Sequence, residues 1–194
     1  MQDKDGGVAE YTGTVLVNNV APSVTAGADT TINQNDTLAR NGSFTDPATS
    51  DTWTATVNYG DGGGATSLTL AGDHSFGLSH MYTALGTFTV TVQVLDDDGG
   101  AGTATFNVTV KDVTPPAVVC GTADGQWHGA DVSIACTATD AGSGLANPAD
   151  ASFALSTNVT AGSETANAST GSRQVCDVAG NCVTAGAIAG NQVD

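Results

Sequence analysis

The chain has 194 residues, a net charge of −16 and only four basic residues. We therefore expect neither nucleic-acid binding nor attachment to anionic lipid, because nothing in the chain would neutralise phosphates. The hydrophobic share of 40% is enough for a packed core. No apolar run approaches the ~18 residues of a membrane helix, so we expect no membrane insertion.

A segment of the sequence occurs twice. Residues 3–22 recur without a gap as residues 96–115, an offset of 96 − 3 = 93 residues. Each copy reads as an acidic glycine turn, an alternating strand and a short linker that ends in proline. Self-similarity at a fixed spacing predicts an array of repeated domains. Residues 1–19 are then expected to be the last strand of a preceding repeat, so that the chain begins inside one.

The chain between residues 20 and 112 alternates apolar and polar residues in short segments separated by turn clusters. This pattern predicts an antiparallel β-sandwich. The expected strands are residues 23–26, 37–44, 52–58, 67–70, 87–95 and 103–110.

Two prolines, Pro115 and Pro116, stiffen the linker that follows, because each fixes its own φ and restricts the residue before it. Residues 113–194 are expected to form a second sandwich. Its strands are predicted at residues 117–120, 132–139, 152–155, 164–167, 172–176 and 182–187. Abundant Thr, Val, Ala and Gly support the all-β prediction of two tandem antiparallel immunoglobulin-like β-sandwiches preceded by an orphan strand.

Residues 20–112 carry the motifs Tyr59-Gly60-Asp61-Gly62, His80-Met81-Tyr82, Gly86 to Val92, and Asp98-Gly99-Gly100. This combination resembles the PKD (polycystic kidney disease) domain. Val57 stands where a Trp is common in that family, and Trp53 is expected to take over part of its packing.

The second domain carries Asp124-Gly125-Gln126-Trp127, Thr137 to Asp140 followed by Gly142-Ser143-Gly144, and Asp177 to Asn181. It resembles a bacterial immunoglobulin-like domain of large surface proteins. Both resemblances imply stalk, adhesion or spacer roles in an extracellular or cell-surface setting.

Acidic residues of the first domain fall in two loops that such a sandwich places at the same end. Asp46 and Asp51 lie in one loop, and Asp96 and Asp98 lie in the other, with Asn19 of the preceding linker nearby. Four neighbouring carboxylates repel one another unless a cation joins them, and Ca²⁺ takes oxygen ligands from flexible loops. The sequence therefore predicts a calcium site here. The alternative is that Asp simply favours turns.

The second domain repeats this arrangement, which predicts a second calcium site. Asp112 lies in the linker, Asp140 follows one predicted strand and Asp177 follows another. Ca²⁺ is the expected cofactor of both domains.

All four cysteines lie after residue 119, which indicates disulfides in an oxidising compartment. Cys136 shares parity with Val132 and Ile134, and Cys120 shares parity with Val118, so both point into the core. Val175 is the inward residue of its strand, which turns Cys176 outward, opposite Cys182. Cys120–Cys136 with Cys176–Cys182 is the favoured pairing. The rival, Cys136–Cys176 with Cys120–Cys182, would reproduce the bridge between sheets of antibody domains.

Catalysis has little support, and we expect no enzyme. Asp73, His74 and Ser75 hold the side chains of a hydrolase triad, but consecutive residues of an extended chain point to opposite faces. Trp53 and Trp127 are expected to pack in a core or at a sheet edge rather than to form a sugar-binding platform.

Two function classes remain. The first is a structural module, a calcium-stiffened stalk or filament unit whose partners are neighbouring copies or repeats, with residues 8–18 available for donor-strand pairing. The second is a carbohydrate- or protein-binding accessory module that presents its loops to a glycan or protein receptor. A concave cluster of exposed aromatic residues would favour the second class.

Overall fold

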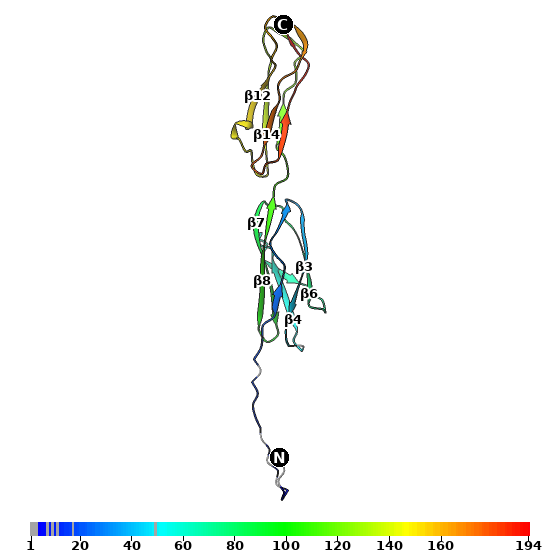
Figure 1. The fold of residues 1–194 in the computed structure, drawn as a ribbon, viewed down its shortest axis with the longest axis vertical. Coiled ribbons are helices and arrows are strands. Elements are labelled where there is room, and N and C mark those ends of the chain that lie inside the picture. The colour runs from blue at the N-terminus through cyan, green and yellow to red at the C-terminus, as the bar shows by residue number, and fades with distance from the viewer. Residues whose placement is uncertain (1–3, 7, 9, 11, 17, 49) are drawn as a thin grey trace. The chain divides into compact units, whose positions relative to one another are not determined.

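A computed structural model of the chain describes residues 4–6, 8, 10, 12–16, 18–48 and 50–194. Its regular elements in these residues are strands and one short 3-10 turn, as Figure 1 shows. The chain divides into two compact units, one of residues 1–27, 40–78 and 90–106, and the other of residues 28–39, 79–89 and 107–194. This division runs through four strands, and the predicted boundary between residues 112 and 113 stays a prediction.

The first sandwich has two sheets. The larger sheet has the order β2-β8-β7-β4-β5, and the smaller sheet has the order β1-β3-β6. The strands are β1 (Ser23–Thr25), β2 (Thr30–Asn33), β3 (Thr37–Thr45), β4 (Trp53–Asn58), β5 (Ala65–Leu68), β6 (Ser75–Met81), β7 (Gly86–Asp96) and β8 (Ala101–Lys111).

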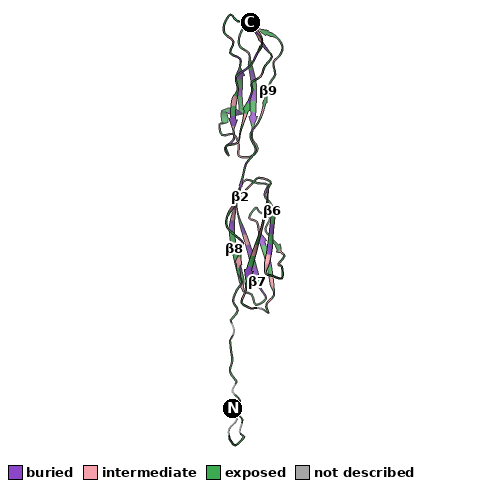
Figure 2. Ribbon diagram, turned by 45° about the vertical axis from the view of Figure 1, so that its right-hand side comes forward, coloured by how far each residue is buried: buried purple, intermediate pink, exposed green. Residues whose placement is uncertain are grey.

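Strict alternation along β7 builds much of this core, because successive side chains of a strand point to opposite faces. Val90, Val92 and Val94 are fully buried, whereas the residues between them are less buried or exposed. Figure 2 colours the ribbon, β7 included, by burial. Phe44 of β3 and Ala55 of β4 pack with Val94 in one hydrophobic cluster. The strands that flank the acidic loops are therefore anchored in the core.

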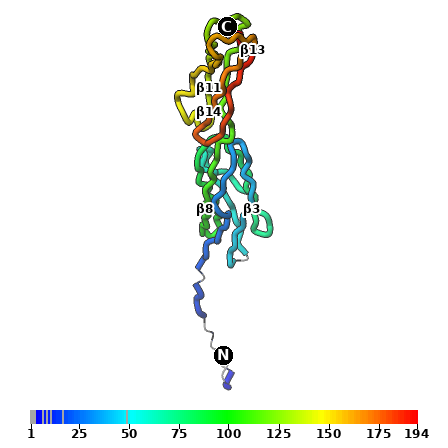
Figure 3. Tube along the Cα trace, turned by 45° about the horizontal axis from the view of Figure 1, so that its top comes forward, coloured from blue at the N-terminus to red at the C-terminus, as the bar shows by residue number. Residues whose placement is uncertain are grey.

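The second sandwich contains three small sheets with the orders β12-β11-β9, β14-β15 and β10-β16-β13. Figure 3 traces the path of the chain, with β11, β13 and β14 of this sandwich labelled. Its elements are β9 (Ala117–Cys120), β10 (Trp127–His128), β11 (Ser133–Thr139), η1 (Pro148–Ala151), β12 (Ser152–Ser156), β13 (Thr165–Ala168), β14 (Arg173–Cys176), β15 (Cys182–Ala185) and β16 (Asn191–Val193). The core cluster combines Cys136, Phe153, Leu155 and Val175.

The structure contains the favoured disulfide pairing. Cys120 and Cys136 are directly opposed on β9 and β11, and Cys176 and Cys182 are opposed on β14 and β15. Cys136 is 2% exposed, as its parity with Ile134 predicts. Every cysteine of the chain lies in one of the two bridges.

The N-terminal segment differs from the prediction of an orphan strand. Residues 12–16 and 18–19 have no strand, and Val15 and Leu16 are 84% and 83% exposed. The matching residues of the second copy form β8, which lies between β2 and β7 in the larger sheet, and Val108 of this strand is fully buried. Strand partners, rather than the sequence pattern alone, therefore decide whether this pattern forms a strand. Residues 1–3, 7, 9, 11 and 17 of the predicted segment 1–19 lie outside the described residues.

Among the described residues, no helix has the length and apolar character needed to cross a membrane.

Candidate metal centres

The first acidic cluster consists of Asp46, Asp51 and Asp96. One carboxylate oxygen of each lies within 4.8 Å of the others. Asp46 directly follows β3, Asp51 precedes β4, and Asp96 ends β7. Because Trp53 of β4 is paired with Asp96 of β7, strand register brings these two loops together. The loops predicted to share one end of the sandwich do so.

Asp96 is held by a tight turn between β7 and β8 and is 3% exposed. Its Oδ1 accepts hydrogen bonds from the backbone N–H groups of Gly100 at 2.6 Å and Asp98 at 3.1 Å. The Asn19 amide donates to its Oδ2 at 2.9 Å. A Cβ at Gly100 would collide with the Asp96 carboxylate and lie 2.7 Å from the Asn19 amide nitrogen. Glycine at this position therefore allows the linker to approach the turn.

Aromatic packing holds Asp46. Its Oδ2 accepts a hydrogen bond from the Trp53 indole N–H at 3.2 Å, and its Oδ1 accepts one from the Ala48 N–H at 2.9 Å. The Trp53 ring lies 5.4 Å from Phe44 and 4.5 Å from His74 between ring centroids. Trp53 thus performs the packing role expected of it, and its hydrogen bond to Asp46 was not predicted.

Asp51 of the first cluster has a carboxylate oxygen without a hydrogen bond. This atom, Oδ2, is buried and has no hydrogen-bond partner. Burial, followed by the neighbouring carboxylates of Asp97 and Asp46, raises the pKa of Asp51 above its ordinary value of 3.8. A buried carboxylate oxygen without a donor is an unfavourable arrangement that a bound cation would relieve.

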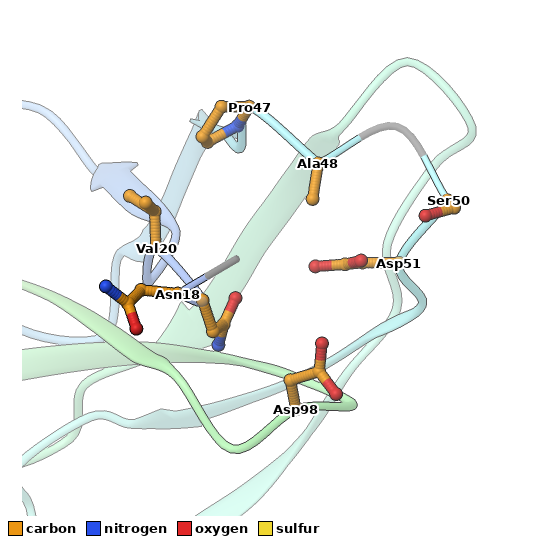
Figure 4. A pocket seen from close by; sticks show the side chains of 8 residues that line it. Asn18, Val20, Pro47, Ala48, Ser50, Asp51 and Asp98 are labelled. Carbon is orange, nitrogen blue, oxygen red and sulfur yellow. The ribbon is translucent and has the colours of Figure 1, made fainter. Parts of the chain in front are cut away.

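A cavity of about 460 Å³ adjoins the first cluster. Figure 4 shows Asn18, Asp51 and Asp98 pointing their side chains into the same space. Asp98 was predicted as a fourth ligand, but it lies outside the group of three whose oxygens converge. The turn directs the Asp98 backbone N–H, rather than its carboxylate, toward Asp96. The complete lining is Asn18, Asn19, Val20, Pro47, Ala48, Ser50, Asp51 and Asp98.

The second acidic cluster consists of Asp112, Asp140 and Asp177, all three of which were predicted. Asp112 and Asp177 are 6% and 2% exposed, so this cluster is more deeply buried than the first. Asp112 accepts hydrogen bonds from the N–H groups of Thr114 at 2.9 Å and Ser143 at 2.7 Å. The Gly144 N–H donates to Asp140 at 2.6 Å. Backbone donors thus orient both carboxylates.

The two clusters use the same kind of turn. The N–H of Asn181 donates to Asp177 Oδ1 at 2.7 Å, as Gly100 does to Asp96, and Gly180 and Gly99 both have a positive φ near 90°. The amide that donates to Oδ2 differs in origin. In the first cluster it comes from Asn19 in the linker, whereas in the second it comes from Asn181 in the turn, at 2.7 Å. The role of Asn181 was not predicted, because a single Asn in a turn has many other uses.

Hydrogen bonding lowers the pKa of one carboxyl in each cluster. The Asn19 amide is the largest cause for the pKa of Asp96, and the Thr114 N–H is the largest cause for the pKa of Asp112. Both groups therefore stabilise the folded state above their unfolded pKa, and this stabilisation is lost as the pH falls through the lower folded pKa.

The pKa of Asp51 is shifted in the opposite direction, upward, which gives a testable pH dependence of stability. Because its folded pKa is raised, the charge on Asp51 opposes folding at neutral pH, and this penalty disappears as the pH falls through the raised value. Without calcium, we expect the D51N variant to melt above the wild type at neutral pH. The difference should vanish on acidification. Thermal melts across pH test this, and a constant difference would show that Asp51 is not the titrating group.

Comparisons with known proteins agree with this fold. Residues 19–110 match the family model of the PKD domain. No curated protein sequence matches the chain. The resemblance of residues 113–194 to a bacterial immunoglobulin-like domain stays a prediction.

Several solved structures resemble the chain at low identity. The titin I-band fragment I67–I69 has 10% identity and a TM-score of 0.46, and the match covers 91% of this chain and 66% of that one. The protocadherin gammaB4 extracellular domain has 10% identity and a TM-score of 0.48, covering 92% and 33%. SGBP-B of the Bacteroides ovatus mixed-linkage glucan utilization locus, in complex with a mixed-linkage heptasaccharide, has 15% identity and a TM-score of 0.36, covering 92% and 48%. The chain spans less than two thirds of each, and these likenesses concern the fold alone.

Proposed function

We propose that the chain is a structural repeat module of an extracellular protein, in which a calcium ion in each acidic cluster fixes the segment that leads into the sandwich. The observation that carries the proposal is the buried, unpartnered Oδ2 of Asp51 beside two other carboxylates. Such an oxygen is suited to a hard cation, which prefers oxygen ligands. Asp46, Asp51 and Asp96 would hold the ion in the first cluster, and Asp112, Asp140 and Asp177 would hold it in the second.

The linker contacts explain why a bound ion would stiffen the module. Asn19 lies just before the first sandwich and donates a hydrogen bond to Asp96 of the first cluster. Asp112 lies just before the second sandwich and is itself one of the three carboxylates of the second cluster. An ion that neutralises the carboxylates would remove their mutual repulsion and hold the linker against the loops. A calcium ion would supply positive charge, and the protein would supply the converging oxygen ligands.

Other features agree with an extracellular structural role. Two disulfides are typical of proteins in oxidising compartments. The net charge of −16 suits a soluble surface that attracts divalent cations. The first sandwich matches the PKD domain, a type of module that occurs in extracellular proteins.

A glycan-binding role is the second candidate, and its support is weaker. Trp127 of the edge strand β10 is 48% exposed and offers one aromatic face to a sugar. Trp53 is instead packed against Phe44 and His74. A sugar-binding platform generally needs several exposed rings, and the exposed large hydrophobic side chains of the described residues include one Trp and no Phe or Tyr.

Thermal unfolding in calcium and in chelator tests the calcium proposal. An ion that binds only the folded state raises its stability by RT ln(1 + [L]/Kd), about 2.7 kcal/mol at a hundredfold excess over Kd. We expect millimolar Ca²⁺ to raise the melting temperature of the wild type. The D51N and D140N variants should each show a smaller rise. In calcium, the melting temperature of D51N should lie below that of the wild type.

The D61N variant is the matched control. It removes one carboxylate from the glycine-rich turn after β4, outside both clusters. It should therefore keep the full response to calcium while carrying the same change of charge. Identical wild-type melts in calcium and chelator would refute the proposal. An equally large loss of the calcium response in D61N would show that calcium acts by general charge screening rather than at the two clusters.

A further inference from the structure

The disulfide between β14 and β15 closes the turn that contacts the linker. We propose that the Cys176–Cys182 bridge is a redox-sensitive clamp on Asp112, so that its reduction releases the linker while the second sandwich stays folded. The contacts that form this clamp lie within the protein and require no bound cation.

The bridge joins the two ends of a very short turn. Cys176 and Cys182 are directly opposed in the strand register, and the five residues between them form the turn. The Asp177 N–H donates to the Asn181 carbonyl at 3.0 Å, and the Asn181 N–H donates back to the Asp177 side chain at 2.7 Å. The covalent link therefore restricts the position of Asn181.

Asn181 connects this turn to the linker. Its amide Nδ2 donates to the backbone carbonyl of Asp112 at 3.2 Å. A second route runs through Ser143, whose Oγ accepts from the Ala179 N–H at 3.1 Å and whose own N–H donates to Asp112 at 2.7 Å. Two independent contacts thus depend on the position of the turn.

The fit around Asp112 is tight. A Cβ at Gly142 would overlap the Asp112 carboxylate, so that only glycine leaves room for this side chain. Asp112 is 6% exposed. Asp112 can therefore leave its position only when the surrounding loops move. The Cys176–Cys182 disulfide opposes the movement of one of these loops, the turn between β14 and β15.

The two disulfides differ in accessibility. Cys182 is exposed and Cys176 is half-buried, whereas in the other bridge Cys120 is half-buried and Cys136 is only 2% exposed. Thiol–disulfide exchange needs access of a thiolate to a sulfur atom. A dithiol reductant therefore reaches the hairpin bridge first. It supplies two electrons and two protons, breaks the S–S bond, leaves two cysteine thiols and becomes a disulfide itself.

The first sandwich provides an internal comparison. Its equivalent turn between Asp96 and Gly100 has the same two hydrogen bonds from backbone N–H groups, but Leu95 and Ala101 flank it instead of cysteines. The contact of Asn19 with Asp96 therefore has no covalent clamp. Redox control is expected at the Asp112 linker and not at the Asn19 linker.

Limited proteolysis with trypsin tests the proposal on the full chain in calcium-free buffer. The sequence has four trypsin sites, Lys4, Arg40, Lys111 and Arg173. Lys111 is the last residue of β8 and directly precedes Asp112, so cleavage there requires local opening of the linker. Arg173 lies in β14 and is paired with Asp150, so cleavage there reports unfolding of the second sandwich.

We expect mild reduction to accelerate cleavage after Lys111 about fivefold, the change in open population that the loss of one net hydrogen bond produces. Cleavage after Arg173 and Arg40 should stay at its oxidised rate. The N181A variant should be cleaved quickly at Lys111 even when oxidised, and the C176A/C182A variant should behave like the reduced wild type without any reductant.

Two results would overturn the proposal. Equal cleavage rates after Lys111 in the oxidised and reduced protein would show that the bridge does not control the linker. A parallel rise at Lys111 and Arg173 would show that reduction unfolds the sandwich instead. Because calcium is absent from the experiment, either result leaves the calcium proposal to be judged separately.

Discussion

The C120A/C136A variant is expected to lose about 2–5 kcal/mol of unfolding free energy, and to lose it in the second sandwich alone. The bridge joins opposed residues of β9 and β11, and Cys136 belongs to the core cluster with Phe153 and Leu155. Its removal frees the unfolded chain and also leaves a small gap in the core. Hydrogen exchange followed by mass spectrometry measures the change for each strand.

The first sandwich and the second disulfide serve as controls. β7 has no cysteine and should keep its exchange rates. The C176A/C182A variant should lose less stability, because its bridge joins residues 6 apart instead of 16. The chain-entropy relation puts this difference at about 0.8 kcal/mol. A larger loss in C176A/C182A, or faster exchange in β7, would contradict the assignment of the core bridge.

Many strands that pair antiparallel with their neighbours were predictable from the sequence. The predicted residues 132–139 and 117–120 agree closely with β11 and β9, because alternation marks the buried face and turns mark the ends. β2, β6, β10 and β16 were not predicted. β2 and β10 are short and pair in parallel, β2 with β8 and β10 with β16. No hairpin turn connects two parallel strands, so the local sequence carries no turn signal that would indicate the pair.

The candidate sites were predictable at the level of loops but not of atoms. Strand order places the loops of Asp46 and Asp96 together, and any sandwich of this kind would do the same. The position of Asp98 depends on a turn in which Asp96 accepts backbone hydrogen bonds. Because of this turn, the Asp98 carboxylate does not join the other three, although it was an expected ligand. The unpartnered oxygen of Asp51 depends on tertiary packing, which no sequence pattern reports.

The Phe44→Ala variant is expected to destabilise the first sandwich by about 3–5 kcal/mol, the usual range for a buried Phe. Phe44 is 3% exposed and packs with Ala55 and Val94. Its ring also lies 4.7 Å from His74 and 5.4 Å from Trp53. The substitution therefore leaves a cavity and removes the support of the indole that donates to Asp46. Denaturant unfolding with Trp fluorescence measures both effects.

The same variant links core packing to the proposed calcium site. With Trp53 loosened, Asp46 loses an oriented hydrogen bond, so we expect a smaller calcium response in the first sandwich and an unchanged one in the second. Leu155→Ala is the matched control, because it makes a cavity in the other core and leaves Trp53 untouched. Phe44→Leu should restore most of the volume but not the ring stacking. If Phe44→Ala lowers stability yet keeps the full calcium response of the first sandwich, then Trp53 does not position Asp46, and the carboxylates converge through strand register alone.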